Sequence, residues 1–192
     1  MELDDNSMKA SVYKVNLPDE SSKMMVIRNT IMKLAAEVAG QIIIYMWNGV
    51  TALMLRDALV EDGYAVALTL GADRDKLAKD FNDGLIKVLI STDIVAWGID
   101  QSKVNLVVNF DPPVDYPYDN ATEPYTRGYK ARISKAGWFG GKGGAVFNLI
   151  CGHRENMLME KIQRDFNHNV TEVPSWNSAD DFKDALEKAG LN

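Results

Sequence analysis

The sequence predicts an α/β fold in which a mostly parallel sheet carries helices on both faces. Short apolar runs with the composition of buried strands alternate along the chain with helical patterns of about a dozen residues. This alternation is typical of parallel strands that are joined by crossover helices. Residues 41–46 and 88–90 are predominantly apolar, which indicates strands that are covered on both faces of the sheet.

Several segments are predicted to be extended. The first alternates polar and apolar residues and stops at Pro18, and the others are short apolar runs bounded by glycine, proline or polar residues. In chain order these segments are residues 11–17, 41–46, 64–70, 88–90, 104–108, 145–150 and, as a short final piece, 170–173.

Helices are predicted between these strands from apolar residues at helical spacing and from capping residues. Ser21 or Ser22 is expected to cap the first helix, and Ser178 or Asp180 the last. A long loop follows Asp111, and the helix after it has only a weak pattern. The predicted helices are residues 21–39, 51–62, 73–81, 127–136, 155–166 and 178–190.

The length of 192 residues suits a lead-in over residues 1–10 and one domain over residues 11–192. A net charge of −6 argues against a protein that coats DNA, although a small local phosphate site is compatible with it. One cysteine permits no internal disulfide, and two widely separated histidines argue against a metal centre. No stretch has the length of a membrane span and the acidic start is unlike a secretion signal, so we expect neither secretion nor membrane binding.

The glycine-rich segment 137–144 does not have the spacing of a phosphate-binding P-loop. No Ser or Thr follows its lysine, Lys142, and the segment precedes a strand, whereas a P-loop follows a strand and opens a helix. No other segment fits a P-loop, and the two histidines give no Ser/His/Asp arrangement. We therefore do not expect the chain by itself to be a hydrolase or a kinase.

Residues 87–100 are the most informative segment. The buried strand at residues 88–90 is followed by the polar residues Ser91, Thr92 and Asp93, and the backbone is free to bend at Gly98. In an open α/β sheet, residues just beyond the carboxyl end of a strand lie in the crevice where ligands bind. The same pattern also fits an ordinary strand exit capped by Ser and Thr, and the residues alone leave both interpretations open.

Three segments, in this order, resemble the motifs of one family. Residues 88–100 (VLISTDIVAWGID) resemble motif V of the DEAD-box RNA helicases, and residues 129–143 (YKARISKAGWFGGKG) resemble motif VI. Residues 41–48 stand where motif IV would. The tail, residues 157–191, is similar to the mRNA-export (nuclear-pore) branch of the family in its plant-like form. The resemblance extends from residue 11 to the end of the chain.

The resemblance implies a C-terminal RecA-like lobe, a three-layer domain that is one half of a helicase. In the family, ATP, Mg²⁺ and single-stranded RNA are held between this lobe and an N-terminal RecA-like lobe, and RNA is gripped along its sugar–phosphate backbone. Alone, the lobe is expected to bind RNA weakly and not to hydrolyse ATP. The branch further implies an mRNA-export activator or a nucleoporin as a partner, in the cytoplasm or at the nuclear pore.

Carried over position by position, the resemblance implies two sets of site residues and no metal ligand. The RNA-binding set is Asn48, Gly71, Arg74, Thr92 and Asp93, of which Thr92 matches a phosphate contact. The nucleotide-side set is Gly98, Asp100, Arg132, Lys135 and Phe139, of which Asp100 matches the ribose side.

The motifs are degenerate at positions that would face phosphate. Lys135 and Trp138 occupy the positions of the two arginine fingers, and histidines or arginines of the family are replaced by Leu70, Trp97 and Ala131. An arginine finger is worth roughly a thousandfold or more in rate. Lysine lacks the planar fork of arginine, and tryptophan carries no charge. Trp97 and Trp138 could stack on RNA bases, pack against their own loops, or form an apolar patch that faces a partner.

Two functions follow from the motifs and their departures. The first is the C-terminal lobe of a DEAD-box ATPase, active only with an N-terminal lobe. The second is a catalytically dead RNA- or protein-binding module, a decoy or regulator that keeps the lobe fold. A small flavodoxin-like ligand binder would explain the sheet but not the order of the motifs.

Overall fold

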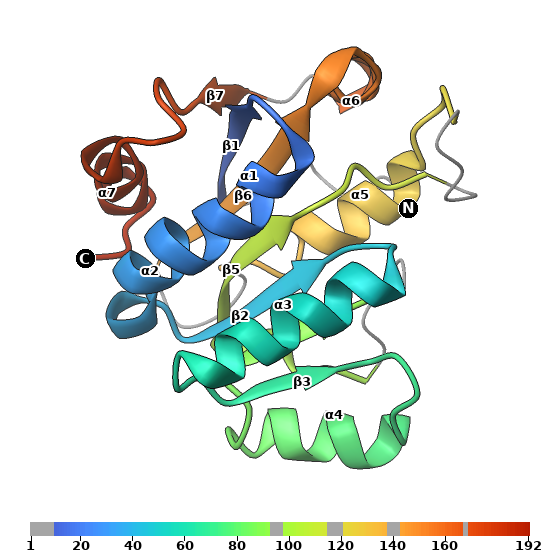
Figure 1. Cartoon of the computed structure of the whole chain (residues 1–192), viewed down its shortest axis with the longest axis vertical. Helices are drawn as coiled ribbons and strands as arrows, with labels where there is room; N and C mark the ends of the chain where they lie inside the picture. Colours follow the sequence, from blue (N-terminus) through green and yellow to red (C-terminus); the bar gives the residue numbers. More distant parts are fainter. Residues whose placement is uncertain (1–9, 93–97, 115–120, 138–142, 167–168) are drawn as a thin grey trace.

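The computed structural model describes residues 10–92, 98–114, 121–137, 143–166 and 169–192. At its centre is a seven-stranded sheet in the order β3-β4-β2-β5-β6-β1-β7, and all of its strand pairs are parallel (Figure 1). The strands are β1 (Ala10–Leu17), β2 (Gln41–Tyr45), β3 (Val66–Leu68), β4 (Val88–Ser91), β5 (Val104–Asn109), β6 (Gly144–Cys151) and β7 (Val170–Glu172). The predicted α/β fold with a parallel sheet is confirmed.

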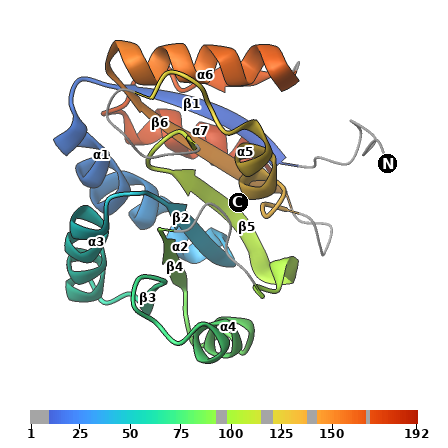
Figure 2. The same cartoon turned by 90° about the vertical axis from the view of Figure 1, so that its right-hand side faces the viewer.

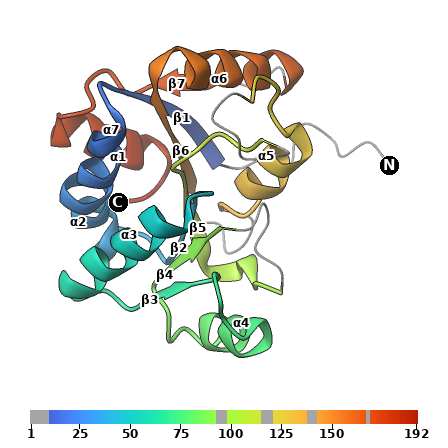
Figure 3. The same cartoon turned by 45° about the vertical axis from the view of Figure 1, so that its right-hand side comes forward.

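Helices cover both faces of the sheet and give three layers (Figure 3). One face carries α1 (Glu20–Val26), the π-helical segment η2 (Ile27–Ile31), α2 (Met32–Val38), α3 (Gly49–Glu61) and α7 (Ala179–Lys188). The other carries α4 (Arg74–Asn82), α5 (Thr126–Ile133) and α6 (Gly152–Phe166), of which α5 and α6 lie side by side (Figure 2). A short 3₁₀ turn, η3 (Gln101–Lys103), precedes β5. Within the described residues, none of the helices combines the length and the apolarity that a membrane crossing requires.

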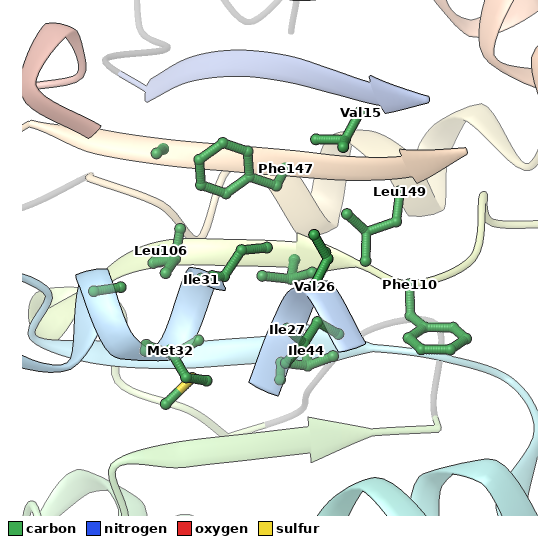
Figure 4. Packing of buried hydrophobic residues seen from close by; sticks show 14 of the residues in the cluster. Val15, Val26, Ile27, Ile31, Met32, Ile44, Leu106, Phe110, Phe147 and Leu149 are labelled. Carbon is green, nitrogen blue, oxygen red and sulfur yellow. The ribbon is translucent and has the colours of Figure 1, made fainter. Parts of the chain in front are cut away.

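The core consists of two apolar clusters, one on each face of the sheet. Side chains alternate between the two faces of the sheet along each strand. In β2, Ile42 and Ile44 therefore belong to one cluster, and Ile43 and Tyr45 belong to the other. All of β2, β4 and β5 is buried, as expected for parallel strands between two helical layers. Figure 4 shows the first cluster, in which α1, η2 and α2 pack on the sheet through Val26, Ile27, Ile31 and Met32 against Ile44, Leu106 and Phe147.

The prediction that Ser21 or Ser22 caps the first helix was wrong. Asp19 is the cap: its carboxylate accepts hydrogen bonds from the Ser22 backbone N–H at 2.8 Å and from the hydroxyls of Ser21 and Ser22. These hydrogen bonds lower the pKa of Asp19. The serines are donors to the cap because an anionic acceptor next to them binds the helix N-terminus more strongly than a hydroxyl does.

Other boundaries differ by a few residues. The predicted strand 64–70 is shortened to β3, and the weakly patterned helix 127–136 is α5 followed by a turn. The predicted helix 155–166 begins earlier, at Gly152, whose positive φ of 74° follows β6 directly. Of the two predicted caps for the last helix, Ser178 is the one observed, because its side chain accepts a hydrogen bond from the Asp181 N–H.

The described glycines of segment 137–144 pack against backbone. A Cβ on Gly143 would lie 1.6 Å from the carbonyl oxygen of Ala189, and a Cβ on Gly144 would lie 2.8 Å from Gly137. The start of β6 therefore approaches both the turn after α5 and the end of α7 more closely than any side chain would allow. This contact gives these glycines a structural role, in agreement with the absence of P-loop spacing.

Candidate RNA and nucleotide interface

The carboxyl ends of β2, β4, β5 and β6 lie along one edge of the sheet, because the strands are parallel. Trp47 and Asn48 follow β2, Thr92 follows β4, and Asp111 follows β5. This edge is where an open α/β sheet places its ligands. We call it the carboxyl edge.

Thr92 is held at the carboxyl edge by Thr69, which follows β3. The Thr69 hydroxyl accepts a hydrogen bond from the backbone N–H of Thr92 at 3.0 Å, and the two hydroxyl oxygens are 3.3 Å apart. Thr69 also stays in register with β4 through its backbone N–H, which donates to the carbonyl oxygen of Ile90. Both side chains are only partly buried, so their hydroxyls are within reach of a ligand.

Gly71 lies in the turn that joins β3 to α4, and Arg74 begins α4. Gly71 has a positive φ of 72°, and Asp73 caps α4 by accepting from the N–H groups of Asp75 and Lys76. Arg74 is therefore the first residue of α4, and its side chain is exposed. The turn brings the Arg74 backbone to the same edge as Thr92, although the two residues are far apart in sequence.

Asn48, a member of the predicted RNA-binding set, has a structural role as the N-cap of α3. Its side-chain oxygen caps α3 by accepting a hydrogen bond from the Thr51 N–H at 3.0 Å. The Asn48 side chain also carries an NH₂ group with two donors, which the capping bond does not use. The contact to RNA at this position stays a prediction.

Gly98 and Asp100 do not lie at the carboxyl edge. The Asn82 side chain, at the end of α4, donates to the Gly98 carbonyl oxygen at 3.1 Å and accepts from the Asp100 N–H at 2.7 Å. Ser102 and Lys103 line the same hollow as Lys87, which precedes β4. This part of the chain has thus returned to the amino ends of the strands, so the crevice expected from strand order holds Thr92 but not Asp100.

Asp100 is an exposed carboxylate in an ordered turn. Both of its oxygens accept hydrogen bonds from Ser102, one from the backbone N–H and one from the hydroxyl, each at 2.9 Å. These two bonds lower the pKa of Asp100. The carboxylate is anionic at neutral pH and reaches solvent, so it can accept further hydrogen bonds from the hydroxyls of a ligand.

Arg132 is buried, with 4% of its surface exposed. Its Nη1 donates to the Asp111 carbonyl oxygen at 3.0 Å and to the Asn109 side chain at 3.4 Å, and the guanidinium carbon lies 4.8 Å from the centre of the Tyr45 ring. Burial lowers the pKa of Arg132 to about 10. In this arrangement the guanidinium group faces the carboxyl end of β5 from inside the domain.

Lys135 lies in the turn after α5, close to the amino end of β5. Two residues further on, the Gly137 N–H donates to the carbonyl oxygen of Val104, the first residue of that strand. The Lys135 side chain is half-buried, and burial lowers the pKa of its amine. Lys135 and Asp100 therefore both border the start of β5, which makes this the second candidate contact region.

Asp93, Trp97, Trp138 and Phe139, which the sequence also singles out, lie outside the described residues. Sequence reasoning missed the residue that joins several loops of the carboxyl edge, Lys23, which is fully buried in α1. Its signal was a lysine that shares the helical spacing of the buried Val26 and Ile27, a pattern that is usually apolar throughout.

The chain matches the family of the helicase conserved C-terminal domain over residues 22–140. It is 42% identical over 187 residues to the DEAD-box ATP-dependent RNA helicase 38 of rice, covering 95% of this chain, and 44% identical over 184 residues to the Arabidopsis thaliana protein of that name, covering 93%. The chain belongs to the helicase C-terminal domain family, in the form found in DEAD-box RNA helicases. It spans 36% of the length of each of these two relatives.

Solved structures agree with this assignment. The C-terminal domain of S. cerevisiae Dbp5 L327V, bound to Gle1 H337R and IP6, aligns with a TM-score of 0.81 at 25% identity and covers 95% of this chain and 99% of that one. S. cerevisiae Dbp5 bound to RNA and ADP BeF3 aligns with the same TM-score and identity over 98% of this chain and 48% of that one. The RecA-like fold implied by the motifs is therefore confirmed.

Proposed function

We propose that the chain acts as the C-terminal lobe of an RNA-dependent ATPase that remodels RNA and serves mRNA export. The observation that carries this proposal is that the motif residues fall into two groups. Thr92, Asn48 and the turn to Arg74 belong to the carboxyl edge, whereas Asp100 and Lys135 border the amino end of β5. Two contact regions on one lobe suit a domain that meets RNA at one place and a nucleotide at another.

The RNA region is built for backbone contacts. Thr92 offers a hydroxyl, Arg74 an exposed side chain, and Gly71 an exposed backbone, on which an added Cβ would meet no atom of the described residues within 4 Å apart from its chain neighbours. Hydroxyls, guanidinium groups and backbone N–H groups bind phosphate without reading base sequence. With Asn48 and Asp93, they form the RNA contact of this proposal, which a lone lobe would hold only weakly.

ATP and Mg²⁺ would bind only when an N-terminal lobe supplies a P-loop and a carboxylate for the metal. The residues of the nucleotide-side set fit ATP only in part. Asp100 reaches solvent and can accept from a ribose, and Lys135 can offer one point charge. Arg132 is enclosed by Asp111, Asn109 and Tyr45 at the carboxyl end of β5, so it fits a role in supporting the carboxyl edge from inside the domain better than a contact with the nucleotide. Gly98 and Phe139 complete the nucleotide set.

Export factors are the remaining partners in the proposal. The structural neighbours include Dbp5 bound to Gle1, and Dbp5 bound to Nup159, Gle1, IP6 and ADP. The similarity covers nearly the whole of this chain, so an activator or a nucleoporin could dock on the same fold. The proposed location is the cytoplasm and the nuclear pore.

The test is steady-state ATP hydrolysis by this chain mixed with, or joined to, the N-terminal lobe of the rice relative. We expect hydrolysis that requires both lobes and increases with single-stranded RNA. The controls are each lobe alone and the mixture without RNA. No turnover with both lobes and RNA in excess would contradict an enzymatic role.

A catalytically dead binding module is the second candidate, and the arginine-finger positions favour it. Lys135 is half-buried with an amine whose pKa is lowered, and Trp138 carries no charge. A lobe of this kind would still bind RNA or an export factor and could compete with an active helicase. Inhibition of a full-length relative by added chain, in the absence of any turnover with the N-terminal lobe, would identify this role.

A further inference from the structure

Lys23 is a lysine with no exposed surface. Its Nζ donates to the carbonyl oxygen of Phe110 at 2.8 Å and forms an ion pair with Glu155 at 2.8 Å. Asp111 at 3.7 Å and the more exposed Glu20 at 3.3 Å complete its surroundings. A buried ammonium group is strongly destabilising unless it is paired and hydrogen-bonded. Here the Phe110 carbonyl accepts a hydrogen bond, and the three carboxylates balance the charge.

The partners of Lys23 come from two different strand ends. Phe110 and Asp111 follow β5, whereas Glu155 lies in the first turn of α6, which follows β6. The second oxygen of Glu155 accepts a hydrogen bond from the Cys151 backbone N–H at 2.7 Å. Lys23 therefore ties α1 to the chain beyond two neighbouring strands of the carboxyl edge.

Asp111 extends this connection to the proposed site. Its Oδ2 accepts from the backbone N–H of Trp47 at 3.1 Å, in the turn that holds Asn48, and its carbonyl oxygen accepts from Arg132 at 3.0 Å. One buried cation is thus two contacts away from the motif IV turn and from the motif VI helix. None of these contacts depends on a ligand.

A metal ion does not need to be invoked for this cluster. Carboxylate oxygens of Glu20, Asp111 and Glu155 lie within 4.8 Å of one another, a spacing that a cation could use. The Lys23 ammonium group lies among all three, so the cluster already has its counter-ion. Buried ion pairs contribute little net stability compared with apolar residues of the same volume, which points to a geometric role.

We propose that Lys23 is a positioning residue of the cleft: its ammonium group fixes the loop after β5, so that Asp111 holds the Trp47–Asn48 turn and Arg132 in their places. The effect of this positioning on RNA binding and ATP hydrolysis rests on the proposed function above. The positioning itself is a property of the isolated chain. The two can therefore be tested separately.

The first test is amide hydrogen exchange by ¹⁵N NMR on the 192-residue chain. Lys23→Met removes the ammonium group, and the double variant Lys23→Met, Glu155→Gln also removes the buried charge of Glu155 while keeping an acceptor for Cys151, so that Asp111 is the one buried carboxylate of the cluster left without its lysine. In the double variant we expect the Trp47 amide to exchange about tenfold faster or more, because its acceptor is released. Amides in the buried part of α7, which contributes no residue to the cluster, should be unchanged. Lys33→Met, an exposed lysine of α2, is the matched control.

Each outcome of this test is decisive. A folded double variant with an unchanged Trp47 amide overturns the proposal. A double variant that does not fold also overturns it, because the pair would then be required for the fold as a whole. Failure of the single variant Lys23→Met to fold does not overturn the proposal, since that variant leaves two buried carboxylates without a cation.

The second test measures ATP hydrolysis with the N-terminal lobe present. Misplacement of site groups by about 1 Å costs on the order of a hundredfold in rate, so we expect kcat of the folded double variant to fall by about tenfold to a hundredfold. An unchanged kcat contradicts the link to the cleft. If the wild-type chain shows no turnover either, the proposed function fails, and the Trp47 exchange still decides the role of Lys23.

Discussion

The hydroxyl of Thr69 accepts a hydrogen bond from the backbone N–H of Thr92 at 3.0 Å, and this bond joins the ends of β3 and β4. The two side chains also approach each other, with 3.3 Å between their hydroxyl oxygens. Thr92 is the residue that matches the phosphate contact of motif V. Its orientation at the edge of the sheet therefore depends on a neighbour in a different strand.

Replacement of Thr69 tests this dependence. Thr69→Val keeps the shape of the side chain but leaves the Thr92 N–H without its acceptor, at a cost of about 1 kcal/mol. With the N-terminal lobe present, we expect single-stranded RNA to bind several-fold more weakly. Fluorescence anisotropy with a labelled RNA measures this change. RNA affinity equal to that of the wild type, beside a clear loss in Thr92→Val, would show that Thr69 does not orient Thr92.

Lys135 is expected to limit the rate of ATP hydrolysis. In Lys135→Arg, a planar guanidinium group replaces the point charge at an arginine-finger position, and we expect RNA-stimulated turnover with the N-terminal lobe to increase by roughly tenfold or more. Lys130→Arg, an exposed lysine of α5 in the same region, should leave the rate unchanged and is the control. Equal rates for both variants would contradict a role of residue 135 in catalysis.

The close contact of Gly143 with Ala189 should make this glycine irreplaceable. A methyl group at Gly143 would overlap the Ala189 carbonyl oxygen, and we expect Gly143→Ala to destabilise the domain by roughly 3 kcal/mol. Gly63→Ala adds the same methyl group in open space at a positive φ of 94°, so only the backbone conformation opposes it, at about 1 kcal/mol. Urea unfolding compares the two variants. A smaller effect at Gly143 than at Gly63 would contradict the close packing of β6 on the end of α7.

Cys151 should react slowly with alkylating reagents in the folded protein. Burial and the negative charges of Glu155 and Glu20 raise the pKa of its thiol above the ordinary value. A raised pKa leaves less thiolate at a given pH, so the pH–rate profile with iodoacetamide should have its midpoint at higher pH in the folded chain than in urea. Because the chain has a single cysteine, the rate reports on this thiol alone. A folded-state midpoint at or below that in urea would contradict this environment.

The central strands could be predicted because nothing in their sequence competes with the strand assignment. Residues of β2 and β4 are largely apolar and rich in β-branched side chains, and all of them are buried. The first helix was harder to predict, because three of the four residues 19–22 can act as a cap. Asp19 prevails over Ser21 and Ser22 since its carboxylate accepts from both, a competition that propensity alone does not resolve.

The candidate site was only partly predictable for a geometric reason. Strand order predicts the residues that directly follow a strand, such as Thr92, but not where a longer segment leads. Gly98 and Asp100 lie beside the end of α4, so Asp100 contacts Asn82 and not the carboxyl edge. The buried position of Lys23 depends on Phe110 and Glu155, which are 87 and 132 residues away in sequence, and no local pattern contains that information.

The central claim is that this chain is one lobe of an RNA clamp, and RNA affinity tests it most directly. The measurement is the anisotropy of a labelled single-stranded RNA titrated with the N-terminal lobe of the rice relative, with and without this chain, in the presence of ADP and beryllium fluoride. We predict that adding the chain tightens RNA binding by at least about tenfold, and that Thr92→Val removes most of this gain, because the second lobe adds linked contacts. An RNA affinity that is the same with and without the chain would contradict the claim.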